Sequence, residues 1–158
     1  MLSDKNCYNG SIMTETILFD AINKPNDFFK TQIVDFLYEN LDQYGDKKKD
    51  ITKAIEYSIK EFGSFGGFTM IVIEGQTIKG AVVINKTGMS GYIPENILVY
   101  IAIHKDYRGQ GLGKLLMKKA IRYSKGDIAL HVEANNPAKI LYEKLGFTNP
   151  YLEMRLKK

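Results

Sequence analysis

The stretch NILVYIAIHKDYRGQGLGKLLMKKAIRY, residues 96–123, decides the fold of this chain. Its run Ile97–Ile103 is β-branched and aromatic, holds no Gly or Pro, and is too short for an ordinary helix, so it predicts a buried strand. After a basic, Gly-rich turn, apolar residues recur at helical spacing from Leu112 to Ile121. A strand, a Gly-rich turn and an amphipathic helix in this order predict an anion site at the start of the helix.

The turn itself has the features that a phosphate or pyrophosphate group needs. No Ser, Thr, Asp or Asn stands at the helix start to accept its first free amides, so these N–H groups are available to a ligand. A helix N-terminus carries about half a positive charge, and Arg108 and Lys114 stand beside it. A plain Gly-rich turn is the alternative, but the strand, the basic turn and the uncapped helix together favour a ligand.

Two common nucleotide-binding loops do not fit these residues. A Walker loop needs a hydroxyl residue after its lysine, and here Leu115 follows Lys114. The dinucleotide fingerprint needs Gly-x-Gly-x-x-Gly early in a βαβ unit, whereas these glycines are Gly109, Gly111 and Gly113, late in the chain.

Two motifs of the chain resemble those of a known family. Arg108-x-x-Gly111-x-Gly113 matches the Arg/Gln-x-x-Gly-x-Gly/Ala signature of the GNAT superfamily of acyl-CoA-dependent N-acetyltransferases. Further on, the stretch from Asn135 to Phe147 is similar to its Asn-x-x-Ala-x-x-Leu-Tyr-x-x-x-Gly-Phe element. The resemblance runs from Phe68 to the C-terminus, and both motifs in this order make a specific signal.

The resemblance implies an α/β fold with a central mixed sheet flanked by helices. In the family this sheet splays open between its fourth and fifth strands, and acyl-CoA lies in the V. Here those strands would be Ile97–Ile103 and Ile128–Val132.

The rest of the chain predicts a β-α-α-β-β-β-α-β-α-β order around these strands, after a loose first dozen residues. We expect Asn26 or Asp27 to cap the first helix, and Asp50 and Gly63 to bound the second. Gly63–Phe68 is expected to be a turn or a mobile flap. The remaining predicted elements are strands at Thr16–Ala21, Thr69–Ile73 and Ile78–Asn85, a helix capped by Asn136 and stopped by Gly146, and one or two strands in Phe147–Leu156.

The resemblance also implies a set of cofactor-binding residues. The pantetheine arm would pair with Ile101 and Ile103 at the opened strand edge, and the amide of Ile101 would stabilise the oxyanion. Asn135 matches an asparagine that touches the pantetheine arm, although Asn135 and Asn136 could exchange the roles of contact and helix cap. The pyrophosphate would lie on the turn formed by Arg108, Gly109, Gln110, Gly111, Leu112 and Gly113, with Lys114 beside it.

Tyr142 is the candidate catalytic side chain. It stands where the family often has a tyrosine that acts as general acid to the leaving thiolate. The alternative is a core tyrosine, because Tyr142 lies in an apolar stripe with Ala138, Leu141 and Leu145. We name no general base: Ile97 stands where some relatives have a strand glutamate, and no nearby carboxylate or histidine matches a family base position.

Length and composition exclude several classes of protein. From the length of 158 residues and the mass of 17.9 kDa, we expect residues 1–158 to form a single domain. One cysteine, Cys7, permits no internal disulfide and no cysteine cluster for a metal, which fits a reducing cytoplasm. The sequence contains no run of eighteen apolar residues, so it predicts no membrane span. The net charge of +4 falls on ordinary solvated faces without aromatic interleaving, so we expect no nucleic-acid partner.

The sequence therefore predicts an enzyme that transfers an acetyl group from acetyl-CoA to a primary amine in one direct step, without a metal, as a monomer or homodimer. The competing hypothesis is a catalytically silent acyl-CoA-binding sensor or partner module of the same fold. The acceptor is not identified. Acidic residues Asp35, Glu39 and Asp42 on the first helix would favour a cationic amine, but a solvated helix face explains them better.

Overall fold

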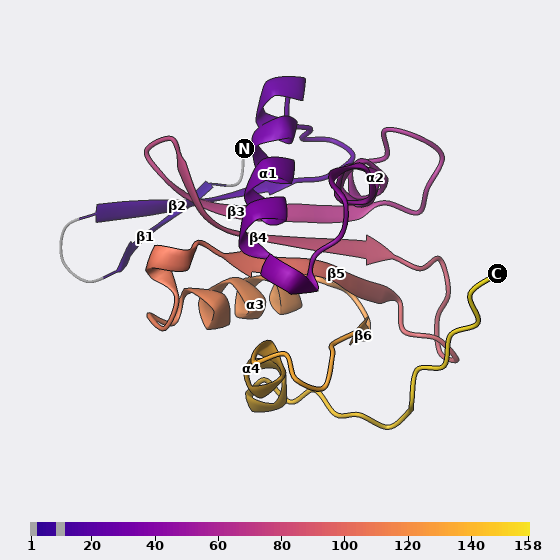
Figure 1. Ribbon diagram of the computed structural model, residues 1–158. Coiled ribbons are helices and arrows are strands. Elements are labelled where there is room, and N and C mark those ends of the chain that lie inside the picture. The colour runs from indigo at the N-terminus through magenta and orange to yellow at the C-terminus, as the bar shows by residue number, and fades with distance from the viewer. Residues whose placement is uncertain (1–2, 9–11) are drawn as a thin grey trace.

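The computed structural model describes residues 3–8 and 12–158. They form one six-stranded mixed sheet in the order β1-β2-β3-β4-β5-β6, covered by helices on both faces (Figure 1). β5 and β6 are parallel and every other neighbouring pair is antiparallel. The strands are β1 (Ser3–Tyr8), β2 (Ile12–Phe19), β3 (Gly67–Glu74), β4 (Thr77–Lys86), β5 (Asn96–Ile103) and β6 (Ile128–Leu130). The helices are α1 (Asp27–Asn40), α2 (Lys48–Ser58), α3 (Leu112–Tyr123) and α4 (Ala138–Lys144), with 3₁₀ turns η1 (Asp42–Tyr44) and η2 (Lys105–Tyr107).

The sheet separates two apolar cores. Helices α1 and α2 pack on one face, where Ile33, Leu37, Ile51 and Ile55 are fully buried. Helices α3 and α4 cover the other face with Leu116, Met117 and Tyr142 among the buried residues. Figure 1 shows these two helix pairs on opposite sides of the sheet. Each face of the sheet is thus desolvated by an amphipathic helix pair, which is the main stabilising contribution in such a layered fold.

A β-bulge interrupts β5 at Val99. In the pairing of β4 with β5, Val83 lies opposite Tyr100 and Ile84 opposite Leu98, so that Val99 has no partner on β4. The extra residue resets the alternation of side chains. Val99 and Tyr100 therefore both pack in the α1/α2 core, whereas Ile101 packs in the α3/α4 core.

The fold confirms the mixed sheet that opens beside the central strand and most of the expected elements. Asn26 caps α1, because its side chain accepts a hydrogen bond from the Phe29 amide at 2.8 Å. The α2 bounds were wrong. The helix begins after Lys47, so Asp50 lies inside its first turn, and it ends at Ser58, before Gly63.

Both ends of the chain also differ from the sequence-based expectation. The loose first dozen residues contain β1, which gains its hydrogen bonds from β2, so the central strand is the fifth rather than the fourth. No helix or strand forms in Phe147–Leu156. Pro150 interrupts the predicted strand, and Leu152, Met154 and Leu156 are more than four-fifths exposed, so this segment lacks the packing that stabilises a strand.

The loop before β3 is a turn with identified contacts. The Ser64 hydroxyl donates to the Tyr57 carbonyl at 2.8 Å, and the Phe65 ring lies directly against Gly88. Among the described helices, none is long and apolar enough to cross a membrane.

Candidate functional site

The Gly-rich turn connects the C-terminal end of β5 with α3. Gly109 and Gly111 have φ angles of 75° and 82°, which place both in the left-handed region that favours glycine. Gly111 is the N-cap of α3 and makes no side-chain cap hydrogen bond. The first backbone bond of the helix runs from the Leu115 amide to the Gly111 carbonyl at 3.0 Å. Within the described chain, no oxygen accepts from the amides of residues 112–114, as the sequence predicted.

β5 has an open edge next to this turn. β6 pairs with β5 at Asn96, Ile97 and Leu98 and then departs, so the two strands separate at the bulge. The His104 amide donates to the Lys79 carbonyl on β4 at 2.8 Å. Because successive backbone groups of a strand face opposite neighbours, the amides of Ile101 and Ile103 face away from β4, toward the gap left by β6.

Arg108 lies at the start of the turn, but its guanidinium has other partners. Its Nε donates to the Ile103 carbonyl at 3.1 Å, its Nη1 to the Asp42 carboxylate at 3.0 Å, and its Nη2 to the Asn40 carbonyl at 2.7 Å. The Arg108 guanidinium, followed by Lys105, lowers the pKa of the Asp42 carboxyl below its ordinary value. The backbone amide of Arg108 remains a predicted cofactor contact.

Lys114 differs from Arg108 in this respect. It lies in the first turn of α3 and is exposed, and none of the described residues pairs with its ammonium group. Gln110, on the same turn, donates from Nε2 to the Asp106 carbonyl at 3.4 Å. Lys114 therefore carries the positive charge of this turn that remains unpaired within the described chain.

Tyr142 comes from α4 and is 6% exposed. Its ring packs edge-on against Phe147 with centroids 5.8 Å apart, and the ring belongs to the α3/α4 core. Burial raises the pKa of the Tyr142 phenol to about 12. None of the described groups hydrogen-bonds its hydroxyl, whereas a core tyrosine usually satisfies it.

α4 lies close to the Gly-rich turn, and the loop before α4 contains Asn135 and Asn136, whose side chains differ in their hydrogen bonding. A Cβ atom on Gly113 would lie 3.5 Å from both Leu141 of α4 and Ile103 of β5. The N-cap residue of α4 is Pro137, and the Asn136 side chain accepts from the Ala138 amide, the first of the helix, at 2.9 Å. Asn135 is exposed and its side chain has no hydrogen bond to the described residues, which leaves it available to a ligand.

The connection between α1 and α2 borders the same region, a feature that local sequence patterns did not indicate. The Tyr44 hydroxyl donates to the Asn135 carbonyl at 3.3 Å, and the Tyr100 hydroxyl donates to the Asp46 carboxylate at 2.6 Å. Burial and Asp46 together raise the pKa of Tyr100. These pairs are 91 and 54 residues apart in sequence, so no short motif contains them.

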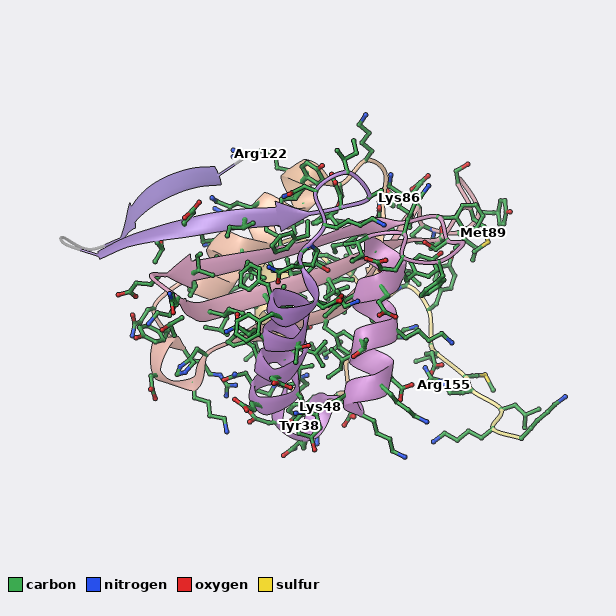
Figure 2. All side chains as sticks on the ribbon, turned by 90° about the horizontal axis from the view of Figure 1, so that it is seen from above. Tyr38, Lys48, Lys86, Met89, Arg122 and Arg155 are labelled. Atoms are coloured by element: carbon green, nitrogen blue, oxygen red, sulfur yellow. The ribbon has the colours of Figure 1, made fainter. Side chains whose placement is uncertain are left out.

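Two of the three acidic residues considered for amine recognition form ion pairs, and one of them, Asp42, lies in η1 beyond the end of α1. Asp35 pairs with Lys48 at 2.8 Å, and the Lys48 ammonium lies 5.1 Å from the centre of the Tyr38 ring. Figure 2 shows Tyr38 and Lys48 side by side at the same end of the two helices. Asp42 pairs with Arg108 and Lys105. These pairs favour the solvated helix face over a recognition site for cationic amines.

The candidate bases near β5 have structural roles or lie in solvent. Glu95 accepts from the Asp127 amide at 2.7 Å, and this hydrogen bond lowers the pKa of Glu95. His104 accepts at Nδ1 from the Asp106 amide at 3.2 Å and caps η2. Among the described residues, no group of three His, Cys, Asp or Glu side chains could hold a metal ion.

The sequence is similar to those of known acetyltransferases and of one further protein. The model of an acetyltransferase (GNAT) domain matches residues 66–149. N-alpha-acetyltransferase 30 of Schizosaccharomyces pombe is 29% identical over 85 residues, which are 51% of this chain and 57% of that protein. Cysteine-rich protein 2-binding protein of Mus musculus is 35% identical over 54 residues, 34% of this chain and 7% of that protein. The chain thus spans less than two thirds of either relative.

The fold is also similar to solved structures. An aminoglycoside N-acetyltransferase in complex with CoA superposes with a TM-score of 0.69 at 10% identity, over 96% of this chain and 99% of that one. At this identity the likeness shows the fold alone.

The pairing of Asp42 predicts a pH-dependent contribution to stability. Because its pKa is lowered in the folded state, the contribution is present above the ordinary value of about 3.9 and is lost as the pH falls through the folded pKa. We expect Asp42→Asn to cost at most about 1 kcal/mol at pH 7, since the pair is partly exposed, and to cost nothing near pH 2. Urea unfolding of both proteins across this range measures the difference, and an equal cost at both pH values would contradict the assignment.

Proposed function

The chain belongs to the GNAT acetyltransferase family, and on this premise we propose that it transfers an acetyl group from acetyl-CoA to a primary amine by direct attack in a ternary complex. The observation that carries the proposal is the pairing of an uncapped helix start with an open strand edge. The free amides at the start of α3 suit the pyrophosphate, and the edge of β5 beyond Leu98 suits a chain of amides. Acetyl-CoA contains both groups, because its pantetheine arm carries two amides and is joined at one end to the pyrophosphate.

The cofactor would bind mainly through backbone groups. The amides from Arg108 to Gly113 would take the pyrophosphate, with Lys114 as the charged side chain beside them. The pantetheine arm would extend along β5 and pair with the backbone of Ile101 and Ile103, as an added strand would. Asn135, whose side chain has no described partner, would contact the arm from the other side of the gap.

The chemical step would place the thioester carbonyl beside the Ile101 amide. The amine nitrogen attacks the carbonyl carbon, and the negative charge that develops on oxygen is stabilised by this N–H group, which is already oriented by the strand. Collapse of the tetrahedral intermediate forms the amide, breaks the C–S bond and releases the CoA thiolate. The proton lost by the amine leaves through water, since the described carboxylates and imidazoles near β5 are paired or exposed.

Tyr142 would protonate the departing thiolate. Its phenol keeps its proton at neutral pH because the pKa is raised to about 12, as an acid requires. Its hydroxyl has no described hydrogen-bond acceptor, which supports an acid that meets its partner only when the thioester is bound.

The acceptor belongs to the class of primary amines. Similarity to N-alpha-acetyltransferase 30 supports an α-amino group of a polypeptide as the first candidate. The single cysteine of the chain supports a reducing cytoplasm as the place of the reaction.

A silent acyl-CoA-binding module is the second candidate. It is favoured by Ile97, which stands where some relatives have a strand glutamate, and by the absence of an unpaired base among the described residues named near β5. Such a protein would keep the cofactor site and lack turnover.

Thiol release from acetyl-CoA separates these two functions. We expect release when a panel of amines is added that contains peptides with free α-amino groups, a lysine peptide blocked at its N-terminus, and a polyamine. Ellman's reagent or CoA detection by chromatography measures the product. CoA binding by calorimetry without thiol release from any panel member would favour the silent module, and absence of CoA binding would remove both.

Phosphate binding by the backbone amides at the start of α3 predicts that Gly111→Asp strongly weakens CoA binding. A carboxylate at the start of α3 would occupy the phosphate position and repel its charge in a partly desolvated site. We expect the CoA dissociation constant to rise more than about 100-fold by calorimetry. Gly111→Asn is the matched control, because Asn has the same shape and tolerates the same left-handed backbone without the charge. Equal losses in both variants would mean that charge at this position is irrelevant.

The hydroxyl of Tyr142 predicts a defect in turnover with little change in CoA affinity. Since a thiolate is a tolerable leaving group, we expect Tyr142→Phe to lower kcat by about 10- to several hundred-fold, within the range of acid catalysis. A thioester with a more acidic thiol should shrink the defect. Tyr123→Phe is the control, because Tyr123 is exposed and contacts Asp20 away from the turn. Normal turnover by Tyr142→Phe at pH 7 would assign Tyr142 to the core.

A further inference from the structure

The segment Asn40–Asp46, which we call the α1–α2 connection, contacts the turn, β5 and the loop before α4. We propose that Arg108 is a positioning residue that holds this connection as one wall of the acceptor site, while the backbone amides and Lys114 bind the cofactor phosphates. The proposal rests on the function proposed above, and it assigns the arginine of the Gly-rich turn to the acceptor side of the reaction.

Each of the three nitrogens of the Arg108 guanidinium donates a hydrogen bond to a group of the protein. The acceptors are the carbonyls of Ile103 and Asn40 and the carboxylate of Asp42, at 2.7 to 3.1 Å. A planar guanidinium makes such contacts in a fixed geometry, so turning it toward a phosphate would break all of them together. The loss would include a cation at the C-terminal end of α1, where helix carbonyls lack intrahelical partners.

The backbone of the connection needs this support. Asp42 has a φ angle of 53°, a left-handed conformation that a non-glycine residue adopts only where surrounding contacts hold it. Its carboxylate is held by Arg108 at 3.0 Å and by Lys105 at 3.4 Å. The side chain of Asn40, which is 8% exposed, also fixes the start of the connection. Its Oδ1 accepts from the Lys105 amide, and its Nδ2 donates to the Phe36 carbonyl.

The far end of the connection touches both sides of the opening between β5 and β6. Tyr100 of β5 donates to Asp46, and Tyr44 donates to the carbonyl of Asn135, which follows β6. The connection therefore crosses the gap on the α1/α2 face of the sheet, next to the strand whose open edge would hold the thioester. An amine approaching from that face meets the connection, whose place is fixed by Arg108 at its other end.

Two single-charge changes on the same turn separate positioning from phosphate binding. Arg108→Gln removes the guanidinium that holds Asp42 of the α1–α2 connection, and Lys114→Gln removes a charge that has no described partner. We expect Arg108→Gln to change the CoA dissociation constant by less than about 3-fold, and Lys114→Gln to raise it about 5-fold or more, as loss of a charged phosphate contact should. Calorimetry with CoA measures both.

Hydrogen exchange then reports on the connection itself. We expect the amides of residues 41–46 to exchange at least about 10-fold faster in Arg108→Gln and to be unchanged in Lys114→Gln. With a peptide carrying a free α-amino group as acceptor, KM for the peptide should rise about 10-fold in Arg108→Gln while KM for acetyl-CoA stays constant. A structural weakening of the whole fold would raise exchange everywhere and would not separate the two KM values.

Asp42→Asn is the second variant, because it removes the partner charge while Asn tolerates the left-handed backbone. It should also accelerate exchange of residues 41–46 with CoA affinity retained, and this variant decides the question if Arg108→Gln does not fold. Unchanged exchange in these variants, or a loss of CoA affinity in Arg108→Gln that Asp42→Asn does not share, overturns the proposal. Failure of the wild-type protein to bind CoA removes the proposed function, while the exchange comparison still tests whether Arg108 holds the connection.

Discussion

β5 and β6 share hydrogen bonds over three residues of β5 and then part, and the candidate site depends on that separation. Inside a sheet, an amide or carbonyl without a partner costs free energy, so a strand edge beside a buried core is normally covered. Here the edge beyond Leu98 lies next to the uncapped start of α3. Both features leave backbone donors for a ligand, and together they explain why so few of the proposed cofactor contacts need a particular side chain.

The elements that border this opening come from both faces of the sheet. The α3/α4 face supplies the Gly-rich turn and Tyr142, and the α1/α2 face supplies the connection that borders the opening. Arg108 joins the two, since it belongs to the turn by sequence and to the end of α1 by its hydrogen bonds. Under the proposed function, a residue of the cofactor motif would thus also shape the site of the other substrate.

Local features of the site could be predicted from the sequence, and long-range ones could not. The strand Ile97–Ile103, the uncapped helix after Gly111 and the cap at Asn26 follow from residue types within a few positions. The contact of Arg108 with Asp42 joins residues 66 positions apart, and nothing in either neighbourhood indicates it. β1 is polar and forms through its pairing with β2, whereas the apolar alternation after Pro150 predicted a strand that finds no partner.

The bulge at Val99 also affects which changes in the gene this strand can tolerate. Any β-branched residue at position 99 keeps the number of residues, so Ile101 and Ile103 keep their orientation. Deletion of a single codon there would restore a regular ladder, because Leu98 and Tyr100 already lie opposite the adjacent residues Ile84 and Val83 of β4. Ile101 and Ile103 would keep their partners on β4, so their amides would still face the opening. At this position the strand can therefore lose a residue without a change of register.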